Sequence, residues 1–290
     1  MKTMKRIAGL ICVVSMAFAL TACGGTGDSE DIAKVLSDAQ TKATEAGSME
    51  GDMVMDMSIS ASAGEGTEPQ TMDTVMNMRF VAFNEPMKVK VSMDMSDLLG
   101  QTGEEPAELL VDTYVVEKDG VYYVSTNSGG TWTTDTMELG ELGQLNPQDN
   151  LQMYIDNATS FKKIGEETLE NGTKAVKYSG VITSKSLDKV MAASGMAANM
   201  DQLGVDLDWE ALYTEMGDMP ISIWIDGEGY PVRYEMDMTQ MMNTVFTRVM
   251  EQLGDQAAGY SMTAEKVFIS MDVYNYGGAA DFELPPEAAQ

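Results

Sequence analysis

Methionine alternates with other residues along four separate stretches of this chain. In Met53–Ile59, Met and Ile occupy every second position, and mostly polar residues lie between them. A period of two is the geometry of a β-strand, because successive side chains point to opposite faces of a sheet. The pattern therefore predicts an antiparallel sheet with a Met-rich apolar face and a mostly polar opposite face. The same alternation recurs at 76–80, 89–95 and 234–238.

Residues 1–22 have the features of a bacterial signal peptide. A basic start precedes an apolar run at 7–20, which is too short for a lasting transmembrane helix. The sequence Leu20-Thr21-Ala22-Cys23 resembles a lipobox, in which the cysteine becomes the lipidated first residue of the mature protein. We therefore expect Cys23 to anchor the protein to the extracytoplasmic face of the bacterial cell membrane through acyl chains. The alternative is ordinary secretion with an incidental cysteine.

The charge balance argues against two kinds of partner, nucleic acids and anionic lipid surfaces. The chain has 46 acidic and 18 basic residues, a formal net charge of −28 at pH 7. Nucleic-acid phosphates and anionic lipid would both be repelled. A covalent anchor must therefore hold the protein at the membrane, and the acidic surface serves solubility or collects cations from the wall. Cys12 leaves with the signal and Cys23 carries lipid, so we expect no disulfide.

Turn signals separate the strands, and helices flank them. Residues 23–28 are expected to form a short tether and 29–290 a single domain, because no internal linker divides them. Hairpin signals such as Asn171-Gly172 indicate antiparallel pairing, so the predicted class is α+β, with about eleven strands. Strands are predicted at 48–62, 71–83, 87–95, 109–117, 121–126, 160–169, 173–182, 220–226, 230–238 and 261–275. Helices are predicted at 29–46, 147–158, 186–216 with a break near Gly204, and 240–253, the last with a stripe of Met241, Met242, Val245, Val249 and Leu253.

The commonest catalytic residue type and the common catalytic motifs are missing. The chain contains no histidine, which removes the usual general base near neutral pH, the commonest metal ligand and every Ser-His or Cys-His arrangement. No P-loop, Gly-x-Gly-x-x-Gly or Gly-x-Ser-x-Gly motif is present, so the common phosphate-binding and nucleophile motifs are absent. Carboxylates are abundant, so composition alone does not exclude a glycosidase with paired acids, but nothing in the sequence places two of them in an apolar cleft. We therefore expect no enzymatic activity, no cofactor and no metal site.

Two stretches carry a family resemblance. They are Ile221–Asp226 followed by Gly229–Arg233, and Tyr274–Gly277 followed by Phe282–Pro286. Together with the lipobox, the N-terminal helix and the strand pattern, they resemble the LolA-like fold, which includes bacterial lipoprotein carriers and mycobacterial lipoprotein lipid carriers. Uncharacterised Met-rich lipoproteins of Gram-positive bacteria look similar too. The resemblance implies a curved half-barrel that is closed by helices around an apolar cavity for acyl chains, with no catalytic residues.

Apolar residues in strand phase are the candidate ligand contacts. Met is unbranched and polarizable, so a Met-lined face adapts to varied apolar partners. The sequence leaves open whether this face is a filled core or an open cavity. The candidates are Met53, Met55, Met57, Met76, Met78, Phe80, Met93, Met95, Met236 and Met238.

The sequence therefore leaves three hypotheses for the function. The first is a monomeric lipoprotein that is attached to the membrane by its lipid anchor and binds a lipid or another apolar ligand, without nucleic acid. The second is a surface module that binds a protein or cell-wall partner through its acidic face. The third is Cu(I) binding, because Met thioethers are soft ligands.

Overall fold

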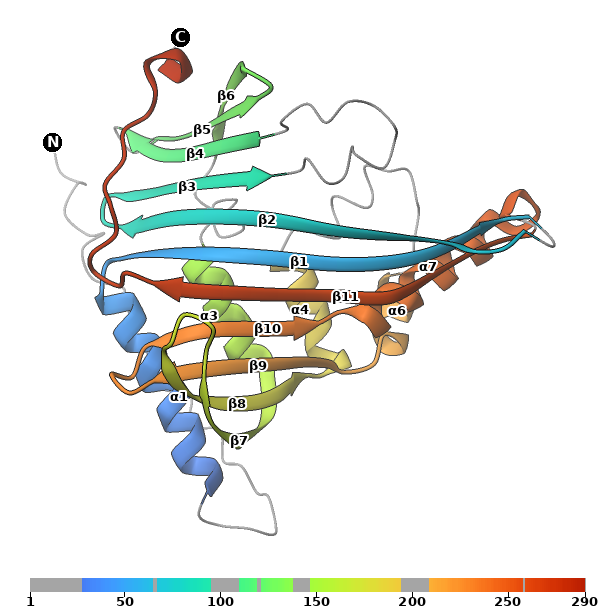
Figure 1. Ribbon diagram of the computed structural model, residues 1–290, viewed down its shortest axis with the longest axis horizontal. Helices are drawn as coiled ribbons and strands as arrows, with labels where there is room; N and C mark the ends of the chain where they lie inside the picture. Colours follow the sequence, from blue (N-terminus) through green and yellow to red (C-terminus); the bar gives the residue numbers. More distant parts are fainter. Residues whose placement is uncertain are drawn as a thin grey trace, which may run out of the picture.

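The structure is a computed structural model that describes residues 28–64, 67–94, 110–118, 121–137, 147–193, 209–257 and 259–289 (Figure 1). The predicted lipidation site Cys23 and the predicted ligand contact Met95 lie outside these residues. Within them, no helix has the length and apolar character needed to span a membrane.

Eleven strands form one sheet, in which every pair of neighbours is antiparallel. The strands are β1 (Ser48–Ala63), β2 (Gln70–Asn84), β3 (Met87–Asp94), β4 (Leu110–Lys118), β5 (Val121–Ser128), β6 (Thr131–Met137), β7 (Ala158–Thr168), β8 (Lys174–Ile182), β9 (Met219–Asp226), β10 (Pro231–Asp237) and β11 (Tyr260–Tyr274). The described helices are α1 (Asp28–Glu45), α3 (Pro147–Asn157), α4 (Ser184–Ala193), α6 (Trp209–Glu215), α7 (Thr239–Leu253), and the 3-10 turns η2 (Gly254–Ala257) and η3 (Pro286–Ala289). The predicted α+β class with an antiparallel sheet is confirmed.

Two meanders meet in the middle of the sheet. The strand order is β6-β5-β4-β3-β2-β1-β11-β10-β9-β8-β7, so the first and last strands of the chain lie side by side. Each meander is held by local turns: at the β7–β8 turn, Gly172 has a φ of +86°, which glycine adopts without steric cost. The pairing of β1 with β11 is the long-range contact that joins the meanders into one sheet (Figure 1).

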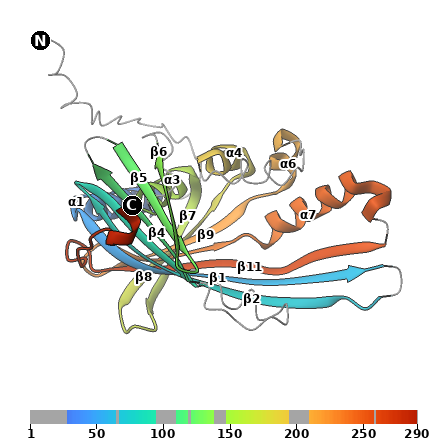
Figure 2. The same ribbon diagram turned by 90° about the horizontal axis from the view of Figure 1, so that it is seen from above.

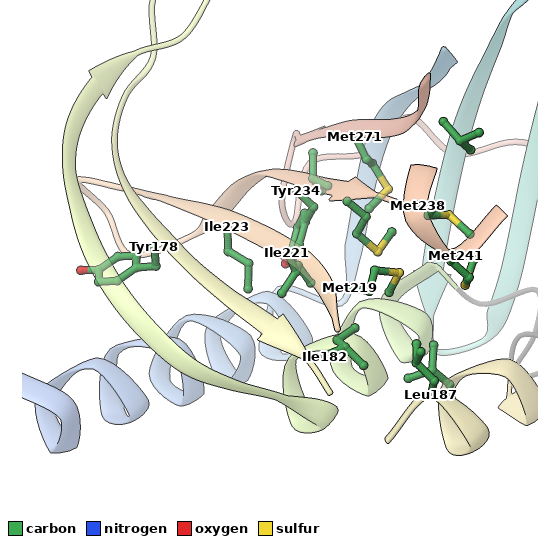
Figure 3. Packing of buried hydrophobic residues seen from close by; sticks show 14 of the residues in the cluster. Tyr178, Ile182, Leu187, Met219, Ile221, Ile223, Tyr234, Met238, Met241 and Met271 are labelled. Atoms are coloured by element: carbon green, nitrogen blue, oxygen red, sulfur yellow. The ribbon is translucent and has the colours of Figure 1, made fainter. Parts of the chain in front are cut away.

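One face of the sheet carries the helices. The core combines strand residues such as Ile223 and Tyr234 with Leu36 of α1, Leu187 of α4 and Val245 of α7. Figure 2 shows α4, α6 and α7 over the same side of the sheet, and Figure 3 shows Leu187 approaching Ile182 and Met219 from the helix layer. Burial of these side chains supplies the main stabilisation, at roughly 25 cal/mol per Å² of apolar surface.

The opposite face carries cross-strand ion pairs. Arg79, Asp52, Asp272 and Arg233 follow one another in register across four neighbouring strands. The guanidinium of Arg233 donates to both carboxylate oxygens of Asp272, at 2.5 and 2.7 Å, and Arg79 donates to Asp52 at 2.9 Å. Planar, two-pronged pairing of this kind favours arginine over lysine. The polar face predicted by the alternation is therefore the outer face.

Candidate apolar binding site

The register places the predicted Met residues on one face, here called the Met face. Met53 lies opposite Met78 on β2 and opposite Met271 on β11. Met78 lies in turn opposite Met93 on β3. Directly paired residues of an antiparallel sheet share a face. By the same rule, the register adds Met55 and Met57 of β1, Met76 and Phe80 of β2, and Met236 of β10 to the Met face.

The Met face is not uniform in burial. Phe80, Met236 and Met238 are buried in the core, and Met53 and Met57 are partly buried against it. The remaining described candidates, Met55, Met76, Met78 and Met93, are half-buried. The structure thus brings the predicted residues together on one face and divides them into filled core and less covered surface.

The interior under the helices excludes water from Tyr234, which is only 2% exposed. Burial raises the pKa of the Tyr234 hydroxyl far above its ordinary value, and the partial burial of Tyr154 on α3 raises the pKa of that hydroxyl too. Desolvation disfavours the charged phenolate, so both shifts have the same physical cause. This part of the Met face is a dry core.

Three strands continue beyond the rest of the sheet as an arm, formed by residues 55–63, 70–76 and 260–267. The pairing of β10 with β11 ends at Asp237 opposite Phe268. The described pairing of β3 with β2 ends at Asp94 opposite Asn77. Figures 1 and 2 show the arm as the long end of the molecule, with α7 running beside β11 on the helix side.

Hydrogen bonds join helix α7 to the backbone of β11, in the part of β11 that does not pair with β10. Asn243 accepts a hydrogen bond from the Ala264 N–H and donates one to the Ala264 carbonyl, both at 2.8 Å. The Thr239 hydroxyl accepts from the Val267 N–H at 2.9 Å. Both Thr239 and Asn243 lie in the first half of α7. Their side chains satisfy backbone N–H and carbonyl groups of β11 that would otherwise lack a partner.

A bulge in β11 accompanies this attachment. Ser58 of β1 lies opposite Lys266, but Ile59 lies opposite Ala264, so Glu265 is an extra residue in the register. Bulges bend a strand and increase its local twist. The extra residue lies next to Ala264, to which Asn243 is hydrogen-bonded.

A pocket of about 470 Å³ lies between the end of α7 and the tip of the arm. Half of the exposed large hydrophobic side chains in the described part of the chain line it: Met72, Leu253, Tyr260 and Met262 are 53%, 44%, 56% and 42% exposed, respectively. Exposed apolar side chains that gather in one concave place indicate a binding site. The full lining is Ala61, Ser62, Ala63, Gln70, Met72, Met250, Leu253, Ala257, Tyr260, Ser261 and Met262.

The pocket exists because the apolar side of α7 is buried at the start of the helix and exposed at its end. Met241 and Val245 in its first half are buried, whereas Leu253 at its end is 44% exposed. Leu253 belongs to the apolar stripe that the sequence predicts, and Met72 keeps the strand phase of Met76 and Met78. Both signals were visible in the sequence. That they meet around an open space follows only from the register of the arm.

None of the nine predicted contacts that the structure describes lines this pocket. Their role in binding stays a prediction, and the pocket adds a second group of apolar residues at the outer end of the same face. Ile59 and Ala61 connect the two groups, because they continue the strand phase of Met55 and Met57 along β1.

The chemistry of the pocket favours binding over catalysis. Its lining is mainly Ala, Met and Leu, with Ser62, Gln70, Tyr260 and Ser261 as the polar members, and none of the lining residues carries a charge. Among the described residues, no three Asp, Glu, Cys or His side chains are grouped in a way that could hold a metal ion. Such a lining can desolvate an apolar molecule and hydrogen-bond a neutral polar group.

The comparisons with known proteins concern the fold. No family model matches the chain, and no curated protein matches it. Among solved structures, the crystal structure of LprF from Mycobacterium bovis is similar, with 14% sequence identity and a TM-score of 0.44. The similarity covers 89% of this chain and 98% of LprF. The similarity to LprF concerns the fold alone.

Proposed function

We propose that this protein is a membrane-anchored surface lipoprotein that binds a lipid or another apolar molecule on its Met face. The observation that supports this most directly is the pocket of about 470 Å³ at the outer end of that face. Its volume falls within the roughly 300–1,000 Å³ range of small-molecule sites. The half-buried Met55 and Met76 lie further along the same face, where flexible thioether side chains can adapt to a guest.

The anchor supports the same proposal. Lipidation of Cys23 would keep the protein beside the membrane, where apolar molecules are concentrated. At about 0.8 kcal/mol per buried methylene group, two or more acyl chains give stable attachment. A binding protein tethered in this way stays close to a source of lipid even though its net charge of −28 disfavours contact with an anionic surface.

Native mass spectrometry of the full-length chain carrying Cys23→Ser, purified without detergent, tests the proposal. We expect a co-purifying apolar molecule, or uptake of one from a lipid dispersion. A protein that remains free of ligand after incubation with neutral and zwitterionic lipids would contradict it.

A matched pair of variants on β2 tests the predicted Met contacts. Met76 lies on the Met face and Asn77 on the outer face. We expect Met76→Glu to weaken uptake, because a carboxylate in contact with an apolar guest must be desolvated. Asn77→Glu adds the same charge one residue away and should leave uptake unchanged.

A further inference from the structure

The size of the arm pocket limits what it can hold. The pocket volume of about 470 Å³ lies in the lower half of the roughly 300–1,000 Å³ range of small-molecule sites. A volume in this part of the range favours a guest with one hydrocarbon chain over a guest with two.

The lining also limits the charge of the guest. No lysine or arginine is among the lining residues, and the whole chain has a net charge of −28. A carboxylate or phosphate at the pocket mouth would find no cation among these residues, and a charged group that loses water without a partner is strongly disfavoured. On the pocket side of the strands, the polar side chains are those of Gln70 and Tyr260, which lie opposite Ala61 and Ala63. They match hydroxyl and ester groups instead.

We propose that the arm pocket binds the single hydrocarbon chain of an uncharged lipid, with the neutral polar head at the pocket mouth near Gln70 and Tyr260. This inference rests on the proposed function and narrows its ligand class. Monoacylglycerol has this chemistry. Fatty acids carry a charge at neutral pH, and diacylglycerol carries a second chain.

Three probes of equal chain length separate the possibilities. Binding of monopalmitoylglycerol, palmitate and dipalmitoylglycerol is measured at pH 8 by native mass spectrometry on the full-length Cys23→Ser chain. We expect monopalmitoylglycerol to bind at least about tenfold more tightly than either of the others. If palmitate or dipalmitoylglycerol binds as tightly, the inference is wrong and the proposed function stands. If none of the three binds, and no other lipid is taken up, the proposed function fails too.

Two neighbouring residues of β1 locate the site. Ala61 lines the pocket, and Ser60 is its neighbour in the strand, so its side chain points to the opposite face. We expect Ala61→Phe to lower the affinity for monopalmitoylglycerol at least about tenfold by filling the space, and Ser60→Phe to leave it unchanged. Equal affinity in both variants would place the lipid elsewhere and overturn the inference.

A charge introduced at the mouth gives a readout that misfolding cannot mimic. Met262 is 42% exposed, so a lysine can extend from this position into water. Met262→Lys should reverse the preference, because the new ammonium group pairs with the palmitate carboxylate and is poorly matched by a glycerol head. A variant that folds and still prefers monopalmitoylglycerol tenfold would show that charge at the mouth does not select the ligand.

Discussion

At the scale of single residues, close packing on the Met face requires a glycine at position 51. Gly51 lies opposite Phe80, which is only 1% exposed. A Cβ atom at position 51 would overlap the Phe80 ring and come within 2.8 Å of the Asp272 carbonyl oxygen. Because backbone stands on one side and a buried ring on the other, neither neighbour can move cheaply.

We therefore expect Gly51→Ala to lower the free energy of unfolding by about 1–3 kcal/mol, the usual cost of overpacking a core. Urea denaturation measures the change. Gly227→Ala is the matched control, because a Cβ atom at position 227 has no neighbour within 4 Å. Equal stability of the two variants would mean that Phe80 is free to move.

Glu235 is a residue of the outer face whose charge is poorly placed. It lies between Ser222 and Ser270 on the neighbouring strands. Burial raises the pKa of this carboxyl above its ordinary value, although Lys177 and Arg233 partly oppose the shift. A carboxyl whose pKa is raised in the folded state binds its proton more tightly there than in the unfolded chain. Its ionisation therefore reduces stability as pH rises through the interval between the unfolded and folded values.

Replacement of this carboxyl should show the corresponding pH dependence. Glu235→Gln is expected to be more stable than the parent chain at pH 8, and the difference should disappear toward about pH 4, where the parent carboxyl is protonated too. Urea denaturation of both proteins at the two pH values measures it. A difference that stays constant with pH, or that grows on acidification, would contradict the assigned cause.

At the scale of elements, α7 takes the place of a missing strand beside β11. The Asn243 amide imitates a strand partner, because it both donates to and accepts from Ala264. We expect Asn243→Ala to lower the free energy of unfolding by about 1–3 kcal/mol, because it leaves a partly buried N–H and a carbonyl unpaired. Hydrogen exchange of the α7 amides should become faster.

Thr247→Ala is the control for this substitution. The Thr247 hydroxyl is exposed and bonds only within its own helix, to the Asn243 carbonyl. Surface changes of this type usually alter stability by less than about 0.5 kcal/mol. Unchanged exchange of α7 in Asn243→Ala would show that apolar contacts alone hold the helix.

Local sequence signals were sufficient for most elements. The strand predicted at 48–62 is β1, Ser48–Ala63, and the helix predicted at 240–253 is α7, Thr239–Leu253. Strand β6, Thr131–Met137, was missed, because Thr and Asp dominate both of its faces and no apolar alternation marks it. Its pairing with β5 is what makes it a strand.

The arm pocket could not be predicted from local patterns. Strand phase assigns Met72 and Met76 equally to the Met face, but Met72 is 53% exposed and Met76 is half-buried. On the other side of the arm, the pairing of β11 with β10 ends at Phe268, and this end is set by long-range register. The bulge at Glu265 is likewise a property of two strands rather than one. Of the helix predicted at 186–216, the structure describes α4 and α6, and residues 194–208 lie outside the described part.

At the scale of the whole molecule, the sheet separates two kinds of surface. The helix-covered Met face holds the core and the arm pocket, and the outer face holds paired charges such as Arg233 with Asp272. An acidic chain of net charge −28 gains nothing from an anionic membrane surface. The proposed attachment to the membrane would therefore depend on the acyl chains at Cys23 rather than on the folded surface.

The proposed anchor would also limit how far the folded part can be from the membrane. Helix α1 begins at Asp28, five residues after Cys23. A chain of this length spans at most about 18 Å when fully extended, at roughly 3.6 Å per residue. Lipidation of Cys23 would therefore keep the start of α1 close to the membrane surface, and this short reach suits a protein that exchanges apolar molecules with it.

Substitution of the anchoring cysteine tests this arrangement in cells. We expect Cys23→Ser to move the protein from the membrane fraction to the culture medium, because the acyl chains would no longer be attached. Cys12→Ser is the matched control: this second cysteine lies within the apolar run of the signal, and its loss should leave the protein in the membrane fraction. High salt should not release the parent protein, since salt screens charge but leaves the burial of acyl chains intact. Retention of Cys23→Ser in the membrane fraction would mean that another part of the chain supplies the attachment, and that the lipobox assignment is wrong.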